Sequence, residues 1–181
     1  KKDPSDLGRV INEVDPENEW VFEFGIATRK FDGTSCAIID GKLYKRFDAK
    51  INKKTGQRRP IPDGAIPCQE ADPHGSWPHW VPCSRDNSED QYHFQAFDYL
   101  NSKDDGTYEL CGPKINGNPE GFFYHFLKKH GSELVPDLEN FDFKSIKEHR
   151  EVDNIEGILF HHRNNEHVRC KIRKSDFGIK R

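Results

Sequence analysis

The sequence predicts an α+β domain built mainly from antiparallel sheet. Its apolar residues fall into short, β-prone segments separated by Gly, Asn, Asp and Pro, a pattern typical of strands joined by tight turns. Only two segments have the spacing of helices, and the chain contains no internal repeat. Its 181 residues suffice for a hydrophobic core, so we expect a single domain over residues 1–181.

The expected elements follow in chain order. Residues 1–20 are polar and acidic, which predicts an extended, loosely ordered lead-in. Asp40-Gly41 is a hairpin turn signal, and alternation along the strand after it places Arg46 on the face opposite Lys45. We expect helices at 88–100 and 142–149, and strands at 20–27, 35–39, 42–47, 107–111, 122–127, 155–161 and 168–172.

The segment 60–83 is dense in proline and tryptophan. Its six prolines exclude a helix or a central strand, so we predict an ordered loop packed by Trp77 and Trp80. Two cysteines and two histidines also lie there, but they lack the closely spaced pairs of zinc modules, and we do not expect zinc. These four residues are Cys68, His74, His79 and Cys83.

Charge is unevenly distributed along the chain. The net charge is −3, yet residues 42–59 hold eight Lys or Arg against Asp48, and residues 169–181 hold six against Asp176. Such clusters indicate phosphate-facing surface or ordinary solvated faces. Five scattered cysteines argue against a disulfide framework, and no leader or membrane-length apolar window is present. We therefore expect a cytoplasmic, reducing location and no membrane partner.

The stretch from Ala27 to Cys36 has the strongest functional signal. Lys30 stands two residues before the Asp32-Gly33 turn, between two apolar, β-prone segments. A desolvated lysine has a lowered pKa, and its neutral amine is a nucleophile. The alternative is a solvated lysine in a hairpin turn, and this motif alone does not decide between the two.

Further charged residues interrupt apolar strands at separate points of the chain. Burial of such groups is costly unless they are paired or bound to a ligand. Carboxylates hold hard divalent cations and basic side chains hold phosphates, so the set predicts a polyphosphate and metal site. Each acid taken alone is also compatible with a surface position at a strand edge. The set is Lys30, Arg46, Glu109, Glu156, Lys171 and Arg173.

Four of these stretches resemble, in order, motifs I, III, IV and V of the covalent nucleotidyltransferases, the ligases and mRNA capping enzymes. They are Lys30-Phe-Asp-Gly33, Glu109-Leu, Glu156-Gly-Ile-Leu-Phe160 and Lys171-Ile-Arg173. Further stretches are similar to the compact ATP-dependent 5′-3′ RNA ligases shared by vertebrates, giant viruses and some bacteria. Among them are Ser76-Trp-Pro-His-Trp-Val-Pro82 and Gly106-Thr-Tyr-Glu-Leu-Cys-Gly112, and the resemblance runs from about Trp20 to Gly178.

The resemblance implies a fold and an activity. The fold would be a nucleotidyltransferase (adenylation) domain of ATP-grasp-like ligase type, with mainly antiparallel sheets around a nucleotide cleft and no OB domain. The activity would be ATP-dependent joining of RNA 5′-phosphate and 3′-hydroxyl ends, as in RNA repair, by a monomer that uses Mg²⁺ or Mn²⁺. A DNA nick ligase, a capping-type transferase and a catalytically silent nucleic-acid-binding relative remain the alternatives.

The resemblance also implies residue roles. Lys30 would carry the adenylate, with Asp32 shaping its loop, and Glu156 would act through the metal. Lys171 would hold the α-phosphate. Arg173 would clamp phosphate, although the family usually has lysine at that position. Arg46 would contact ribose or phosphate, Glu109 would bind the ribose hydroxyls, and either Phe126 or His125 would stack on adenine.

Overall fold

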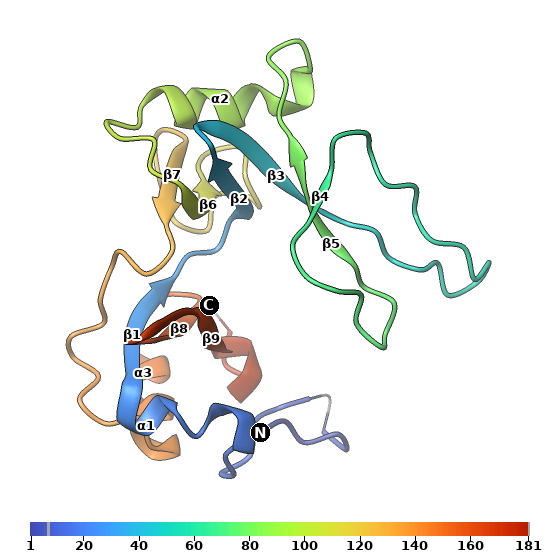
Figure 1. Ribbon diagram of the computed structural model, residues 1–181. Coiled ribbons are helices and arrows are strands. Elements are labelled where there is room, and N and C mark those ends of the chain that lie inside the picture. The colour runs from blue at the N-terminus through green and yellow to red at the C-terminus, as the bar shows by residue number, and fades with distance from the viewer. Residues whose placement is uncertain (7, 181) are drawn as a thin grey trace. The chain divides into compact units, whose positions relative to one another are not determined.

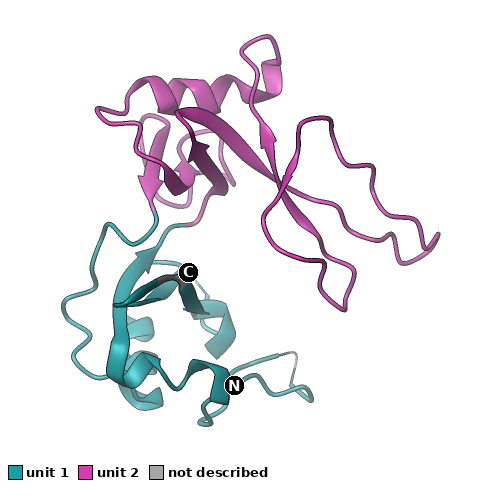
Figure 2. Ribbon diagram, in the orientation of Figure 1, with its two compact units in different colours: residues 1–31, 130–181 teal, residues 32–129 magenta. Residues whose placement is uncertain are grey.

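The structure is a computed structural model that describes residues 1–6 and 8–180 (Figure 1). It confirms the α+β class: antiparallel strands form two sheets, accompanied by a few short helices. The chain divides into two compact units, coloured separately in Figure 2. Unit 1 comprises residues 1–31 and 130–181, and unit 2 is the continuous stretch 32–129.

Unit 1 contains a three-stranded antiparallel sheet in the order β1-β8-β9. The strands are β1 (Gly25–Lys30), β8 (Gly157–His162) and β9 (Asn165–Arg173). The helical segments are η1 (Pro16–Asn18), α1 (Val21–Phe24), α3 (Phe143–Val152) and η3 (Lys174–Phe177). One sheet face packs into a core of Val21, Ala27, Leu138, Ile146, Ile158 and Phe160.

Unit 2 contains a six-stranded sheet in the order β4-β5-β3-β2-β6-β7. The strands are β2 (Thr34–Ile39), β3 (Lys42–Asp48), β4 (Ile66–Pro67), β5 (Pro78–Pro82), β6 (Gly106–Cys111) and β7 (Phe126–Lys129). Helices η2 (Ser88–Asp90) and α2 (Gln91–Asp98) follow β5. The core under α2 contains Cys36, Ile38, Leu43, Ala96, Phe97, Tyr108, Leu110 and Leu127.

Both expected helices are confirmed, and capping explains where they start. The Asn87 side chain accepts a hydrogen bond from the Glu89 N–H ahead of η2 and α2. Asp142 accepts one from the Ser145 N–H at 2.9 Å and caps α3. These side chains satisfy N–H groups that have no partner in the first helical turn.

The strand expected at 20–27 begins only at Gly25, because Val21–Phe24 form α1. The Phe24 N–H donates to the Trp20 carbonyl at 2.8 Å and closes the helical turn. A Cβ atom at Gly25 would lie 2.4 Å from the Val21 carbonyl oxygen. The absence of a side chain there lets the chain pass directly from helix to strand.

The exclusion of a central strand from 60–83 is wrong, because β5 lies between β3 and β4. Pro78 and Pro82 are the first and last residues of β5, opposite Asp48 and Tyr44 of β3. The three residues between the prolines keep their N–H groups for the sheet. Proline is therefore tolerated at the ends of an interior strand.

Two further expectations need correction. Instead of a strand over 122–127, β7 starts at Phe126, because Asn118 exchanges two hydrogen bonds of 3.0 Å with the Phe122 backbone and holds it in a turn. The lead-in is more ordered than expected: Lys2 and Val10 form a β-bridge, and the Val10 N–H donates to the Asp176 carbonyl at 2.8 Å. Within the described residues, no helix is long and apolar enough to cross a membrane.

Candidate active site

The sheet of unit 1 turns one face to its core and carries charge on the other. Lys30 lies opposite Gly157, which in turn lies opposite Arg173. Ile158 and Phe160 belong to the core, so the alternate positions on β1 and β9 point to the other face. Lys171 stands two residues before Arg173 and shares its face. The structure thus brings Lys30, Lys171 and Arg173 to one face of a single sheet.

The Lys30 ammonium forms an ion pair with Glu156. Both side chains are largely buried, at 20% and 21% exposed, and the amine also donates to the Phe31 carbonyl at 3.3 Å. Glu156 directly precedes β8, so the register that puts Lys30 beside Gly157 also brings the carboxylate to the amine. A protonated lysine has no lone pair, so this amine can act as a nucleophile only after it loses a proton.

Gly157 leaves the space between Lys30 and Arg173 free of side chain. A Cβ atom at this position would lie 2.4 Å from the Ile172 carbonyl oxygen and 3.0 Å from the Arg173 Cα. Any side chain would therefore displace β9. The two residues have separate roles: Glu156 supplies the carboxylate that pairs with Lys30, and Gly157 allows β9 to pack closely against β8.

Lys171 is the most accessible of the three cations. Its side chain is exposed, although its amine is partly desolvated. This desolvation lowers the pKa of Lys171, and the positive charges of Lys30 and Arg173 lower it further, against the opposite effect of Glu156 and Asp176. Like charges crowded on one sheet face favour an anionic ligand.

Asp176 completes this cluster, and the sequence interpretation missed its role. It is 5% exposed and accepts hydrogen bonds from the Arg173 guanidinium at 3.1 Å and the Lys2 amine at 3.0 Å. Burial raises the pKa of Asp176, but the bonds from Arg173 and Lys2 outweigh it and hold this pKa below its usual range. The Arg173 backbone N–H also donates to this carboxylate at 2.8 Å. An acid three residues after the residue that begins a helical turn is a capping pattern, so the Arg173–Asp176 spacing could have indicated this contact from the sequence.

The other expected residues lie in unit 2, on the face of its sheet that does not pack against α2. Leu110 and Leu127 belong to the core and are paired in the β6–β7 register. Alternation therefore directs Glu109 and Phe126 to the opposite face. Arg46 shares that face, because its β3 neighbour Lys45 lies opposite the core residue Cys36. The structure brings Arg46, Glu109 and Phe126 to one face.

Glu109 also holds the turn that follows Lys30 and Phe31. It is 8% exposed, and its carboxylate accepts a hydrogen bond from the Gly33 N–H at 3.1 Å. The Asp32 N–H donates to Glu120 at 2.8 Å, so two acids fix the Asp32-Gly33 backbone. A Cβ atom at Gly33 would lie 2.1 Å from the Leu110 carbonyl oxygen, which leaves room only for glycine.

The structure separates the two candidates for adenine stacking. His125 is 7% exposed, stacks on Tyr92 with ring centroids 4.5 Å apart, and bonds to Gln95 at 3.0 Å through Nδ1. Burial and the nearby Lys114 lower the pKa of His125. Phe126 is half-buried and packs edge-on against Phe122. His125 is thus committed to the fold, and Phe126 keeps part of its ring accessible.

The residues present fit polyphosphate better than they fit a metal held by protein alone. The face of unit 1 offers two lysines and an arginine to anionic oxygens. No group of three or more His, Cys, Asp or Glu side chains placed to hold a metal occurs among residues 1–6 and 8–180. Mg²⁺ commonly takes one or two carboxylates together with substrate phosphates and water, a role for which Glu156 is suited.

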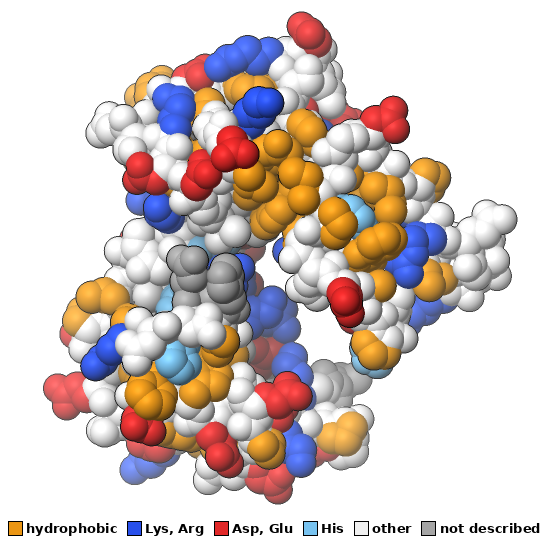
Figure 3. Space-filling view, viewed as in Figure 1, with side chains coloured by type: hydrophobic (Ala, Val, Ile, Leu, Met, Phe, Trp, Pro, Cys, Tyr) orange, Lys and Arg blue, Asp and Glu red, His pale blue; other side chains and the backbone are white. Residues whose placement is uncertain are grey.

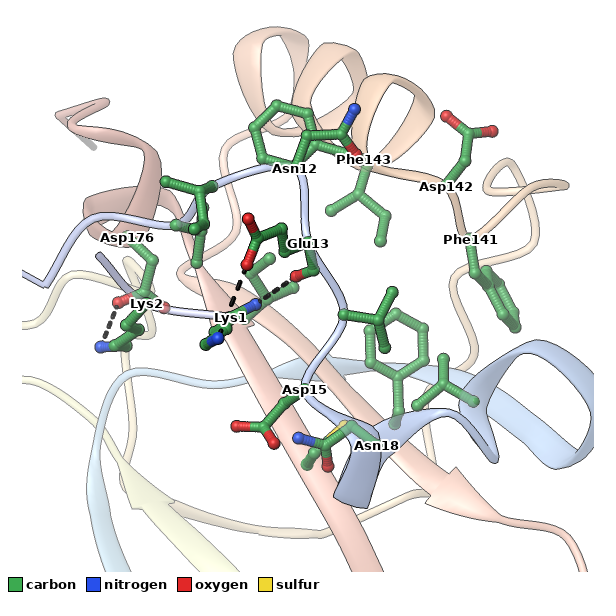
Figure 4. A pocket seen from close by; sticks show the side chains of 18 of the residues that line it. Lys1, Lys2, Asn12, Glu13, Asp15, Asn18, Phe141, Asp142, Phe143 and Asp176 are labelled. Carbon is green, nitrogen blue, oxygen red and sulfur yellow. Dashed lines mark hydrogen bonds and ion pairs between the residues drawn. The ribbon is translucent and has the colours of Figure 1, made fainter. Parts of the chain in front are cut away.

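A cavity of about 470 Å³ lies between the N-terminal segment, β9 and the start of α3 in unit 1. Figure 4 shows Phe141 and Phe143 beside it, with Lys1, Glu13 and Asp176 among the polar residues around it. Lys171 also lines it. Aliphatic and aromatic side chains form much of its wall, so its chemistry does not suit a triphosphate.

Comparison with known proteins identifies RNA ligases as relatives. No family model matches the chain. Proteins named RNA ligase 1 from Rattus norvegicus, Mus musculus and Pongo abelii are each 27% identical to it over 203 aligned positions. Each alignment covers 75% of this chain, which spans 62% of the relative's length. These similarities support a relationship to an RNA ligase family.

Proposed function

We propose that this protein is an ATP-dependent RNA ligase that joins 5′-phosphate and 3′-hydroxyl ends through a lysyl-AMP at Lys30. The observation that carries the proposal is the charged face of unit 1. There Lys30 is paired with Glu156, beside Lys171 and Arg173, on a sheet whose other face is buried. The similarity to proteins named RNA ligase 1 supports RNA as the substrate.

The proposed first step uses the neutral Lys30 amine. Its lone pair attacks the α-phosphorus of ATP, a P–N bond forms, and the bond to the β-phosphate oxygen breaks to release pyrophosphate. Lys171 and Arg173 bind the phosphate oxygens and offset the charge that accumulates on them. Lysine and arginine suit these roles because both carry hydrogen-bond donors and positive charge.

The next two steps transfer and release AMP. A 5′-phosphate oxygen of RNA attacks the adenylate phosphorus, the P–N bond breaks, and Lys30 recovers its amine. A 3′-hydroxyl then attacks the activated 5′-phosphate and displaces AMP, which seals the strand. A divalent cation bound by Glu156 would supply charge neutralisation for the phosphates. We assign nucleoside contacts to Arg46, Glu109 and Phe126, with Asp32 in the turn that Glu120 holds.

Intact-mass measurement after incubation with ATP and Mg²⁺ tests the first step. We expect added AMP on the wild type and none on Lys30→Ala, with Lys42→Ala as a control because Lys42 is an exposed lysine. Protein freed of prior adenylate that gains no mass from ATP, GTP or NAD would refute the proposal. Added GMP from GTP would instead favour a capping-type transferase.

A second assay tests the RNA steps. Adenylated protein, freed of ATP, is mixed with an RNA that carries a 5′-phosphate or with the same RNA carrying a 5′-hydroxyl. We expect AMP to leave the protein only with the phosphorylated RNA. Preference for a nicked DNA duplex over every RNA tested would favour the DNA ligase alternative.

A further inference from the structure

The strands β3, β4 and β5 and the loops between them form a basic extension of unit 2, which we call the arm (residues 42–82; Figure 1). Eight Lys or Arg lie between residues 42 and 59, against the single acid Asp48. Asp48 is itself engaged by Ser76 at 2.7 Å and by the Trp77 N–H at 2.9 Å. Positive charge therefore dominates residues 42–59 of the arm.

One face of the arm carries a cross-strand row of stacking groups. Trp80 lies opposite Ile66 on one side and Arg46 on the other. The Arg46 guanidinium is 5.8 Å from the centroid of the Trp80 ring. Ile66 is 40% exposed, Arg46 is also exposed and Trp80 is half-buried, so part of the row is open to solvent. Figure 3 shows hydrophobic side chains and basic side chains side by side in the region where Figure 1 places β4 and β5.

This face continues the sheet face of unit 2 that bears Glu109 and Phe126. Alternation puts Trp80 and Arg46 on the side away from Lys45, which bonds to the buried Asp90 at 2.5 Å beneath η2. The opposite side of the arm is thus the one tied to the helical layer. The row and the residues assigned to the nucleotide share a single surface within one unit.

The end of the arm is a structured hairpin. Ile51 and Arg58 form a β-bridge, and the Asn52 N–H donates to the Gln57 carbonyl at 2.8 Å. Arg58 bonds to the Ala49 and Gly75 carbonyls and lies 5.4 Å from the Trp77 ring, so it serves the fold. The hairpin therefore holds the residues between Ile51 and Arg58 in a defined place.

The remaining basic residues of the hairpin are exposed. Lys53 and Lys54 occupy its tip, and Arg59 lies over the Phe47 ring at 4.3 Å. Lys50, which pairs with Asp48 at 3.5 Å but is 71% exposed, lines a hollow of about 440 Å³ beside the hairpin together with Arg59. These side chains carry positive charge that the fold leaves accessible to solvent.

We propose that the arm binds single-stranded RNA, an inference that rests on the proposed function and specifies its substrate. Bases would stack on Trp80 beside Ile66, and phosphates would bind Lys50, Lys53, Lys54 and Arg59. Aromatic stacking next to a basic groove is how proteins hold single strands. A duplex hides the faces of its bases, so it cannot use such a row.

Two double variants test the phosphate contacts. Lys53→Gln/Lys54→Gln removes two charges from the tip of the arm, and Lys144→Gln/Lys147→Gln removes two exposed charges from α3 in unit 1. The probe is a short fluorescein-labelled RNA with a 5′-hydroxyl, read by anisotropy at several salt concentrations. We expect the arm variant to bind about tenfold more weakly. The slope of log affinity against log salt concentration should fall in magnitude by roughly one to two. The α3 variant should match the wild type.

A stacking variant tests the row. Trp80→Leu should weaken binding by about tenfold, since one base–aromatic stack contributes about 1–3 kcal/mol, whereas Trp80→Phe should retain most of the affinity. Circular dichroism identifies any loss of folding. The inference is overturned if both lysine variants bind alike, if Trp80→Leu binds like Trp80→Phe, or if a duplex of the same sequence binds more tightly than the single strand.

Adenylation separates this inference from the proposed function. Lys53→Gln/Lys54→Gln should gain AMP from ATP at the wild-type rate, because neither lysine belongs to the reacting groups. Wild-type protein that binds the RNA through the arm but gains no AMP would refute the ligase proposal and leave the arm supported. Protein that gains AMP yet binds RNA independently of these residues would refute the arm alone.

Discussion

The two units use the same plan with different chemistry. Each sheet packs one face into an apolar core and carries charged or aromatic residues on the other. In unit 1 the exposed face holds paired charges: Lys30 with Glu156, and Arg173 with Asp176. In unit 2 the corresponding face holds Glu109 and a broad row of stacking groups. The first arrangement suits bond making at phosphorus, and the second suits recognition of bases and sugars.

The difference shows how a charged residue can be kept in a sheet. Unit 1 pairs its charges directly and leaves Lys171 exposed among like charges. Unit 2 pairs the buried Asp90 with Lys45 on the helix-covered face of its sheet, but on the other face it holds Glu109 through the backbone, by the Gly33 N–H. Removal of a charge should therefore affect the reaction most in unit 1, and removal of a glycine should affect the fold in either unit.

Lys171→Met should produce the largest effect on activity. Loss of the cation that we propose to bind phosphate should slow adenylation by up to about a thousandfold. The free energy of unfolding should change by less than about 0.5 kcal/mol, because Lys171 is exposed and its loss relieves repulsion from Lys30 and Arg173. Single-turnover adenylation and urea unfolding measure the two quantities. A variant with normal adenylation would contradict the role of Lys171, and Lys42→Met in unit 2 is the control.

Gly33→Ala and Gly157→Ala should each destabilise a different unit by about 3 kcal/mol, because each Cβ would overlap a carbonyl oxygen. Hydrogen exchange should show protection lost in β2 and β6 for the first variant, and in β8 and β9 for the second. Gly117→Ala, with open space and a φ of +75°, should cost only about 1 kcal/mol. If either variant lost hydrogen-exchange protection equally in both units, the two units would unfold together.

Asp176→Asn should have a smaller, pH-dependent effect on stability. The folded-state pKa of Asp176 is depressed below its unfolded value of about 3.9, so its carboxylate stabilises unit 1 above that pH. This stability is lost as the pH falls through the folded pKa. We expect a deficit of about 2 kcal/mol at pH 7 that vanishes at acid pH, measured by urea unfolding.

Asp98→Asn in unit 2 is the matched control for that measurement. Asp98 pairs with Arg85 at 2.7 Å, but both side chains are more than half exposed. Solvent screens such a pair, so the variant should lose less than about 0.5 kcal/mol at any pH. A deficit of Asp176→Asn that persists at low pH would refute the electrostatic origin of its effect.

Most strands and both longer helices were predictable from apolar periodicity and capping residues. The errors occurred where a local signal competed with tertiary structure. Trp20 and Phe24 read as strand residues but close a helical turn, since Gly25 permits the sharp change of direction. Pro78 and Pro82 indicated a loop, but the residues between them retain their donors and pair with two neighbouring strands.

The candidate site was partly predictable. Alternation within strands is enough to place Arg46 on the sheet face opposite to that of Lys45, but not to place His125, which lies just before β7. It does not show that Glu109 holds the Gly33 N–H, because that contact joins residues 76 positions apart. Nor does it reveal Asp176, whose partner Lys2 is contributed by the opposite end of the chain.

The discontinuity of unit 1 in sequence has a consequence for biosynthesis. Unit 2 is one uninterrupted stretch, so all of its contacts become available once residue 129 has been translated. Strand β1 must wait for β8 and β9, and Lys30 cannot meet Glu156 until residue 156 and the strand after it have been translated. We therefore expect unit 2 to fold first on the ribosome and the Lys30–Glu156 ion pair to form later.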